Sequence, residues 1–113
     1  MKYQINVVEQ ALIIYFEGNL ISKDRLVDLI NELEVYVEEG INLFVVDVTK
    51  LKHINSTGLS VLLTLLTKAR NSGGELILAG IPEHLNKLLI ITKLNSIFTI
   101  VASVEEGLAA LMV

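Results

Sequence analysis

Cysteine is absent from this chain of 113 residues, and proline occurs only once. Without cysteine the chain has no disulfide, no thiolate metal site and no cysteine nucleophile. Aromatic residues are scarce as well, at 5% of the sequence with three phenylalanines. The core must therefore be built from aliphatic side chains, mainly Leu, Ile and Val, which favours strands and helices packed in layers.

The sequence also lacks a cluster of basic residues. Its formal net charge is −4, and its nine Lys and Arg residues are scattered along the chain. Lys50, Lys52 and Arg70 come nearest to a patch. A surface that neutralises nucleic-acid phosphates needs clustered Lys and Arg. We therefore expect no direct nucleic-acid partner, and we expect these three residues to lie on a solvated rim.

No segment is apolar for long enough to cross a membrane. The longest stretch without a charged residue or histidine, 54–67, contains several polar residues, and it is shorter than the roughly 18–20 apolar residues that span a bilayer. Glu9 and Gln10 interrupt the apolar stretch after Lys2, which is a poor pattern for a signal peptide. We expect a soluble protein without membrane insertion, and the lack of cysteine fits a cytoplasmic location.

The residues that are present indicate one folded domain, 1–113. Apolar residues make up 52% of the chain and charged residues 19%, which excludes a disordered segment. This length leaves no room for a second independent core. No linker, composition shift or internal repeat divides the sequence.

The first half of the chain predicts a hairpin, a helix and a buried strand. Residues 3–8 and 11–17 have strand composition, and the two-residue link between them suggests an antiparallel hairpin. Gly18 and Asn19 break this pattern, and Ser22 is a plausible helix N-cap. The helix has one buried stripe and stops at Gly40. The stripe consists of Leu26, Leu29, Ile30, Leu33 and Val37.

The second half alternates strands and helices. The strands are predicted at 43–48, 75–81 and 96–102, and the first two are apolar enough to be covered on both faces. Helices are predicted from Ser56 to about Ser72, from Pro82 at a first helical position, and after Ser103, which forms a capping box with Glu106. The order predicts an α/β fold with packed helices on a mixed, mostly parallel sheet that has an antiparallel N-terminal edge.

The helix that begins near Ser56 has two contrasting faces. A wide apolar arc contains Leu59, Leu62, Leu63, Leu66 and Ala69. The opposite stripe contains the short polar residues Ser56, Ser60, Thr64, Thr67 and Asn71. Three good capping residues, Asn55, Ser56 and Thr57, stand in a row at the helix start. Capping alone is therefore one explanation for Ser56, and a surface that meets a partner is the other.

The string HINSTGLSVLL, which follows a buried strand and precedes the strand GGELILAGI, resembles the signature of STAS-domain anti-sigma-factor antagonists. The resemblance extends over almost the whole chain, from Gly18, which matches the glycine that ends the family's second strand, to LLIITKLNSIFTIVASVEEGLAAL. The family motif has Asp-Ser-Ser/Thr-Gly-Leu, so this chain has Asn55 where Asp is usual. A second acidic position of the family, after the strand glycine, is Asn19 here.

The resemblance implies a site and partners. It makes Ser56 the phosphoacceptor, with Thr57 as the fallback, and it places partner binding at Asn55, Ser56, Thr57, Gly58, Ser60 and Thr64. The implied partners are an anti-sigma factor that is a serine kinase of the GHKL type and a PP2C-type phosphatase, with no cofactor. In this scheme the unphosphorylated protein binds the kinase and releases a sigma factor, which regulates transcription. The main alternative is a STAS module that is not phosphorylated and serves as a binding or scaffold subunit of a signalling or transporter complex.

An enzymatic function has little support in the sequence. A hydrolase triad would recruit Asp47, His53 and Ser56, but Ser56 lacks the Gly-x-Ser-x-Gly elbow. We expect His53 to be an exposed loop residue and His84 to lie on a helix surface. Neither Gly73-Gly74 nor the surroundings of Gly58 form a phosphate-binding loop, and no metal-ligand spacing is present. We expect a binding protein and not an enzyme.

Overall fold

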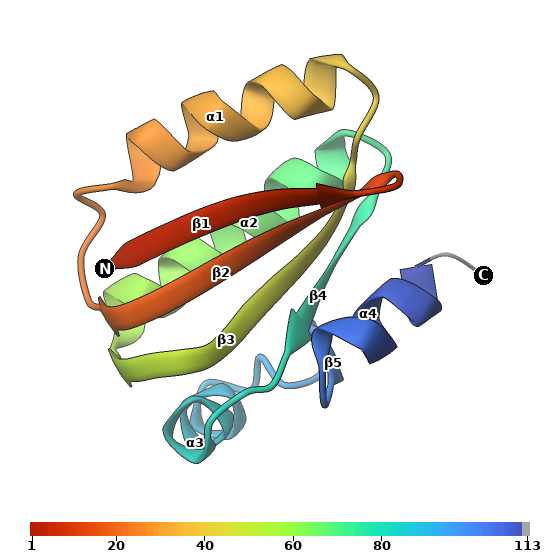
Figure 1. The fold of residues 1–113 in the computed structure, drawn as a ribbon. Helices are drawn as coiled ribbons and strands as arrows, with labels where there is room; N and C mark the ends of the chain where they lie inside the picture. Colours follow the sequence, from red (N-terminus) through yellow and green to blue (C-terminus); the bar gives the residue numbers. More distant parts are fainter. Residues whose placement is uncertain (112–113) are drawn as a thin grey trace.

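The computed structural model describes residues 1–111, in which strands and helices alternate as the sequence predicts. The strands are β1 (Lys2–Val8), β2 (Ala11–Leu20), β3 (Leu43–Ile54), β4 (Glu75–Ala79) and β5 (Thr99–Val101). The helices are α1 (Leu26–Glu38), α2 (Ser56–Asn71), α3 (Glu83–Ile91) and α4 (Val104–Leu111). The last two residues of the expected domain, 1–113, lie outside the described residues. Figure 1 shows the arrangement.

The strands form one mixed sheet in the order β1-β2-β3-β4-β5. β1 pairs with β2 antiparallel, and every other neighbouring pair is parallel. Val8 pairs with Ala11 across the link, where Glu9 takes a left-handed φ of 56°. The predicted α/β class and the antiparallel N-terminal edge are therefore confirmed.

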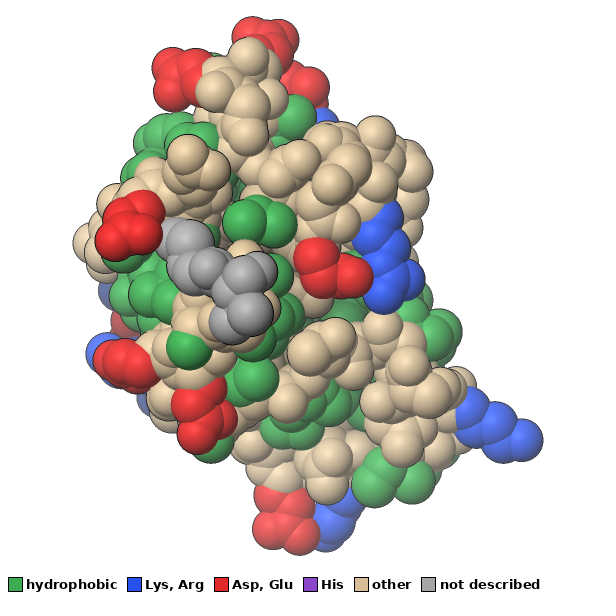
Figure 2. All heavy atoms as spheres, turned by 90° about the vertical axis from the view of Figure 1, so that its right-hand side faces the viewer, with side chains coloured by type: hydrophobic (Ala, Val, Ile, Leu, Met, Phe, Trp, Pro, Cys, Tyr) green, Lys and Arg blue, Asp and Glu red, His purple; other side chains and the backbone are tan. Residues whose placement is uncertain are grey.

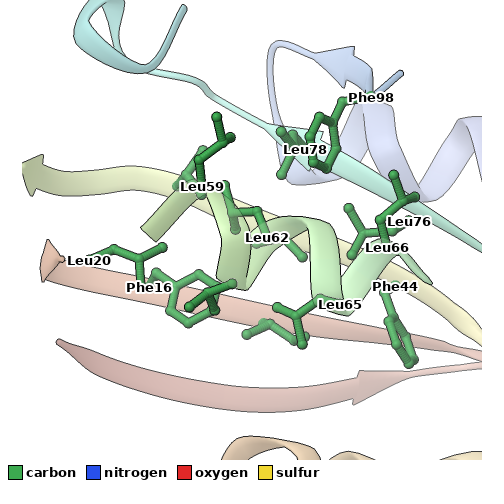
Figure 3. Close-up of a cluster of buried hydrophobic side chains, with 14 of the residues drawn as sticks. Phe16, Leu20, Phe44, Leu59, Leu62, Leu65, Leu66, Leu76, Leu78 and Phe98 are labelled. Carbon is green, nitrogen blue, oxygen red and sulfur yellow. The ribbon is translucent and has the colours of Figure 1, made fainter. Parts of the chain in front are cut away.

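Successive side chains of a strand point to opposite faces of the sheet, so an apolar layer forms on each face. Leu12, Ile14 and Phe16 of β2 point to the face that α1, α2 and α3 cover, whereas Ile13 belongs to a smaller cluster beneath α4. Figure 3 shows how α2 packs its leucines against aromatic and aliphatic side chains of the sheet. Burial of each such leucine contributes about 2 kcal/mol before the entropy cost of ordering it. The described residues contain no buried side-chain polar atom without a hydrogen-bond partner.

β2 and β3 are longer than the sequence indicates. β2 continues through Gly18, which has a φ of +91° and lies between two register shifts in its pairing with β3. β3 continues to Ile54, which pairs with Leu20, so His53 lies on a strand and not in a loop. The predicted break at Gly18 was wrong because a bulge absorbs the left-handed residue without ending the strand. The two extensions carry the chain to the start of α2.

Other boundaries also differ from the prediction, and β4 ends at Ala79, two residues before the predicted end. α1 begins at Leu26 after Arg25, which makes no side-chain cap, while the Ser22 hydroxyl accepts a bond from the Asp24 N–H at 3.5 Å. Ser22 therefore shapes a turn before the helix and is not its N-cap. Residues 96–98 belong to a turn in which the Ile97 N–H donates to the Leu94 carbonyl at 3.0 Å, so β5 keeps only three residues.

The starts of α3 and α4 are close to their predicted positions. Pro82 is the residue before the first helical one, with extended backbone angles, so α3 begins one position later than predicted. Ser103 accepts from the Glu106 N–H at 3.2 Å, as a capping box requires. The Glu106 carboxylate accepts from the N–H of Ala102 at 3.0 Å, one residue earlier than the motif predicts.

Tyr3 connects the edge strand β1 to α1. Its hydroxyl donates to Glu32 Oε1 at 2.8 Å, and the Arg25 guanidinium lies 4.8 Å from the centre of its ring. Desolvation by burial and the Glu32 carboxylate raise the pKa of Tyr3, although Arg25 opposes the shift. The phenol therefore stays protonated at neutral pH and remains a donor.

Candidate functional site

Asn55 caps α2 and also ties it to the end of β2. Its Oδ1 accepts from the Gly58 N–H at 2.9 Å, which satisfies one of the free donors at the helix start. Its Nδ2 donates to the Ile21 carbonyl at 3.3 Å. The amide therefore performs two tasks, of which a carboxylate at this position would perform only the first.

Replacing Asn55 separates these tasks. Asn55→Ala is expected to lower the free energy of unfolding by about 1–2 kcal/mol, because the Gly58 N–H loses its acceptor. Asn55→Asp is expected to stay within about 0.5 kcal/mol of wild type, since its charge favours the helix N-terminus while the bond to Ile21 is lost. Urea denaturation of both variants measures the difference. Equal losses in the two variants would show that the cap contributes nothing.

Ser56 and Thr57 are the first two residues of α2, and both are exposed. Because Asn55 supplies the cap, capping does not explain Ser56. Within the described residues no hydrogen bond involves either hydroxyl, and the backbone N–H groups of both residues precede the first helical bond, from Leu59 N–H to the Asn55 carbonyl. The first turn of α2 contains no acidic residue. Two hydroxyls therefore stand beside free amides at the positive end of a helix.

Gly58 has a different role from its neighbours because it is buried. A Cβ at this position would lie 1.8 Å from the Leu20 carbonyl oxygen and 2.9 Å from a side-chain carbon of Ile54. The first turn of α2 thus rests directly on the ends of β2 and β3. Gly58 allows this close approach, which determines how far Ser56 lies from the sheet.

The polar stripe of α2 borders a shallow groove between α1 and α2. This groove has a volume of about 530 Å³ and is lined by Ile30, Ser60, Leu63, Thr64, Thr67, Lys68, Asn71 and Ser72. The Thr64 hydroxyl donates to the Ser60 carbonyl at 2.9 Å and the Thr67 hydroxyl to the Leu63 carbonyl at 2.9 Å. Each hydroxyl thus uses its donor within the helix and presents acceptor lone pairs outward. Lys68 forms an ion pair with Glu34 that links the two walls.

Ile21 is a surface residue at this site that the sequence pattern does not reveal. Its side chain is 48% exposed, and its carbonyl accepts from Asn55. In the sequence Ile21 reads as part of an apolar run that should turn inward. The bond to Asn55 and the close approach of Gly58 to Leu20 place this exposed apolar residue beside the start of α2.

The candidate hydrolase triad does not assemble. Asp47 and His53 lie on the same strand, six positions apart, which separates them by roughly 20 Å along extended backbone. The Asp47 carboxylate accepts from the N–H of Thr49 at 2.9 Å and from its hydroxyl at 2.6 Å, and not from a histidine. His84 Nε2 lies 3.1 Å from the Leu51 carbonyl. Among residues 1–111 no group of three or more His, Cys, Asp and Glu side chains is arranged to hold a metal ion.

Of the three basic residues nearest to a patch in the sequence, Arg70 lies apart from the other two. Lys50 and Lys52 lie on β3, whereas Arg70 lies near the far end of α2, roughly 20 Å along the helix from its start. Arg70 also pairs with Glu75 at 3.2 Å. Figure 2 shows basic side chains dispersed among acidic and neutral ones on the face that includes α4. In the described part of the chain no helix is long and apolar enough to span a bilayer.

Comparison with known proteins gives a consistent family and fold. The family model described as the STAS domain matches residues 2–107. BtrV of Bordetella bronchiseptica, whose name places it among anti-sigma factor antagonists, is 30% identical over 110 residues, covering 97% of this chain and 94% of BtrV.

Solved structures share the fold. A Thermotoga maritima protein described as an anti-sigma factor antagonist superposes with a TM-score of 0.84 at 19% identity, over 98% of this chain and 95% of that one. The Bacillus protein SpoIIAA in its phosphorylated form superposes with a TM-score of 0.74 at 16% identity, over 96% of this chain and 98% of that one. At these identities the likeness establishes the fold and not the function.

Proposed function

This chain belongs to the STAS domain family, and from this premise we propose that it is an anti-sigma factor antagonist that docks through the start of α2. The proposal is supported by a relative of that name with 30% identity along nearly its whole length. The proposed contact surface consists of Asn55, Ser56, Thr57, Ser60 and Thr64, positioned by the packing of Gly58, with Ile21 as an apolar contact beside them. Its partner is an anti-sigma factor, and the cytoplasm is where such a partner would be met.

The finer part of the proposal is a covalent switch at Ser56. The observation that carries it is that Ser56 is exposed at the first position of α2 while Asn55 supplies the cap, so its hydroxyl is available for modification. In this proposal the anti-sigma factor is a GHKL-type serine kinase, and a PP2C-type phosphatase reverses the modification. A structural relative, SpoIIAA, has been solved in a phosphorylated form. Thr57 is the fallback acceptor.

Phosphate at Ser56 should change docking and not folding. It would add a charge of about −1.5 to −2 and three acceptor oxygens at neutral pH. The free N–H groups at the start of α2 and the positive end of its dipole favour such a group. The surface that meets the partner would become bulkier and more negative, so the modified protein would release its partner.

Intact-mass measurement tests the switch. The protein is first incubated with ATP and a purified GHKL-type kinase whose gene neighbours the gene of this protein. Wild type and Thr57→Ala are expected to gain one phosphate, whereas Ser56→Ala gains none. Thr57→Ala is the matched control because it removes the neighbouring exposed hydroxyl. If Ser56→Ala keeps the phosphate gain, Thr57 or another hydroxyl is the acceptor, and loss of the gain in Thr57→Ala identifies Thr57. If no variant gains phosphate while all bind the kinase, the switch is refuted and the docking function remains.

The presence of Asn at position 55 favours a second candidate function. The family usually has Asp before the acceptor, and Asn55 lacks that carboxylate while it still caps the helix. A STAS module that is never phosphorylated could use the same surface as a binding or scaffold subunit of a signalling or transporter complex. Phosphorylation that appears in Asn55→Asp but not in wild type would favour this candidate.

A further inference from the structure

β1 leaves one long edge of the sheet open. Among residues 1–111 it pairs only with β2, and the opposite edge strand, β5, has just three residues. Natural sheets protect such edges with proline, bulges or several charged residues. β1 contains no proline, its seven-residue pairing with β2 has no register shift, and Lys2 is its only charged residue. The edge is therefore suited to pairing with another strand.

The hairpin determines which backbone groups face the open edge. A two-residue link makes Val8 and Ala11 a hydrogen-bonded pair, and bonded pairs then alternate with non-bonded ones along an antiparallel ladder. Lys2, Gln4, Asn6 and Val8 thus direct their N–H and C=O groups toward β2. The N–H and C=O groups of Tyr3, Ile5 and Val7 point outward, and none of them takes part in a loop, turn or cap bond elsewhere in residues 1–111.

Apolar side chains border this edge. Val7 is 43% exposed and Val8 38% exposed. On α1, Val35 is 56% exposed and lies three residues after Glu32, which reaches Tyr3, so it projects toward the same side of the helix. Edge backbone and exposed valines therefore occupy one side of the molecule.

We propose that β1 pairs antiparallel with β1 of a second copy of this chain, with Ile5 opposite Ile5 of the partner subunit. This register places Tyr3 opposite Val7 of the partner subunit, so every outward N–H and C=O of the three edge residues finds an acceptor or donor. The two five-stranded sheets then form one continuous sheet. The contact is two-fold symmetric and closes on itself, so assembly ends at a dimer.

Charge complementarity supports a second copy as the occupant. In this register Gln4 lies opposite Asn6 of the partner subunit, and two amides can exchange hydrogen bonds. Lys2 lies opposite Val8 of the partner subunit and next to its Glu9, so an opposite charge is near. No like charges face each other across the junction. The dimer uses none of the residues assigned to docking at α2, so the failure of one proposal leaves the other standing.

A charge-exchange experiment tests this register. The acidic double variant Gln4→Glu, Asn6→Glu places like charges opposite each other twice across the two-fold axis, and the basic double variant Gln4→Lys, Asn6→Lys does the same. Both positions are exposed, so each variant should fold, as circular dichroism can verify. Analytical ultracentrifugation measures the mass in solution. A high protein concentration, about 200 μM, is used because dimer formation follows mass action.

Wild type is expected to sediment at twice its 12.5 kDa chain mass. Each double variant alone should dissociate, with a dissociation constant about tenfold higher or more. The equimolar mixture of the two variants should form a dimer again, because every opposed pair then combines opposite charges. A monomeric wild type would overturn the proposal. A dimeric wild type whose variants fail to recombine would overturn the pairing at β1.

Discussion

Gly58→Ala is expected to destabilise the protein strongly. The added Cβ would lie 1.8 Å from the Leu20 carbonyl oxygen and 2.8 Å from the carbonyl carbon, both of them backbone atoms that cannot rotate away. Alanine would normally favour a helix interior by about 1 kcal/mol over glycine. Here α2 would have to lift from the end of β2, and the buried contacts of its first turn would be lost. We expect a loss of at least about 3 kcal/mol, which is a large part of a typical domain stability.

Thermal or urea denaturation measures this loss, and Gly107→Ala is the matched control. Gly107 is also a buried helical glycine, but its nearest neighbours are side-chain carbons of Val45 at 3.0 and 3.3 Å, which can shift slightly. Its substitution is expected to change stability by about 1 kcal/mol or less, because helix propensity offsets the crowding. Equal stability of Gly58→Ala and wild type would contradict the close approach of α2 to Leu20.

Ser56→Asp is expected to weaken binding to the anti-sigma factor by about 30-fold or more, without loss of stability. The carboxylate would face the partner at the centre of the proposed docking surface, where it would be desolvated or repelled. The same charge lies at the positive end of α2, beside the free N–H groups of Ser56 and Thr57, so the helix should tolerate it. The melting temperature should therefore stay within a few degrees of wild type.

Isothermal titration calorimetry against the unmodified anti-sigma factor measures this loss. Thr67→Asp is the matched control, since it adds the same charge to an exposed position further along the same helix. It is expected to keep wild-type affinity, as is Ser56→Ala, which removes the hydroxyl without adding charge. Full affinity of Ser56→Asp would sink the proposal that docking is controlled at this residue. A similar loss in Thr67→Asp would place the contact along the whole stripe of α2.

Most of the fold could be predicted from local patterns. Period-two and helical spacing of aliphatic residues identify every strand and helix in the correct order, because burial of one face requires that spacing whatever the tertiary detail. Element ends were predicted less well. The Gly18 bulge depends on pairing with β3, which local sequence does not encode. The turn at 96–98 returns its N–H bonds to Leu94 although its residues have strand composition.

The sequence by itself determined the α/β class, the antiparallel edge and the position of the motif at the start of a helix, since each follows from residue spacing along the chain. Only the tertiary structure decided which of Asn55, Ser56 and Thr57 caps α2, because the three have similar capping propensities. The Asn55 amide alone is held between the Gly58 N–H and the Ile21 carbonyl. That contact between residues far apart in the sequence leaves Ser56 exposed.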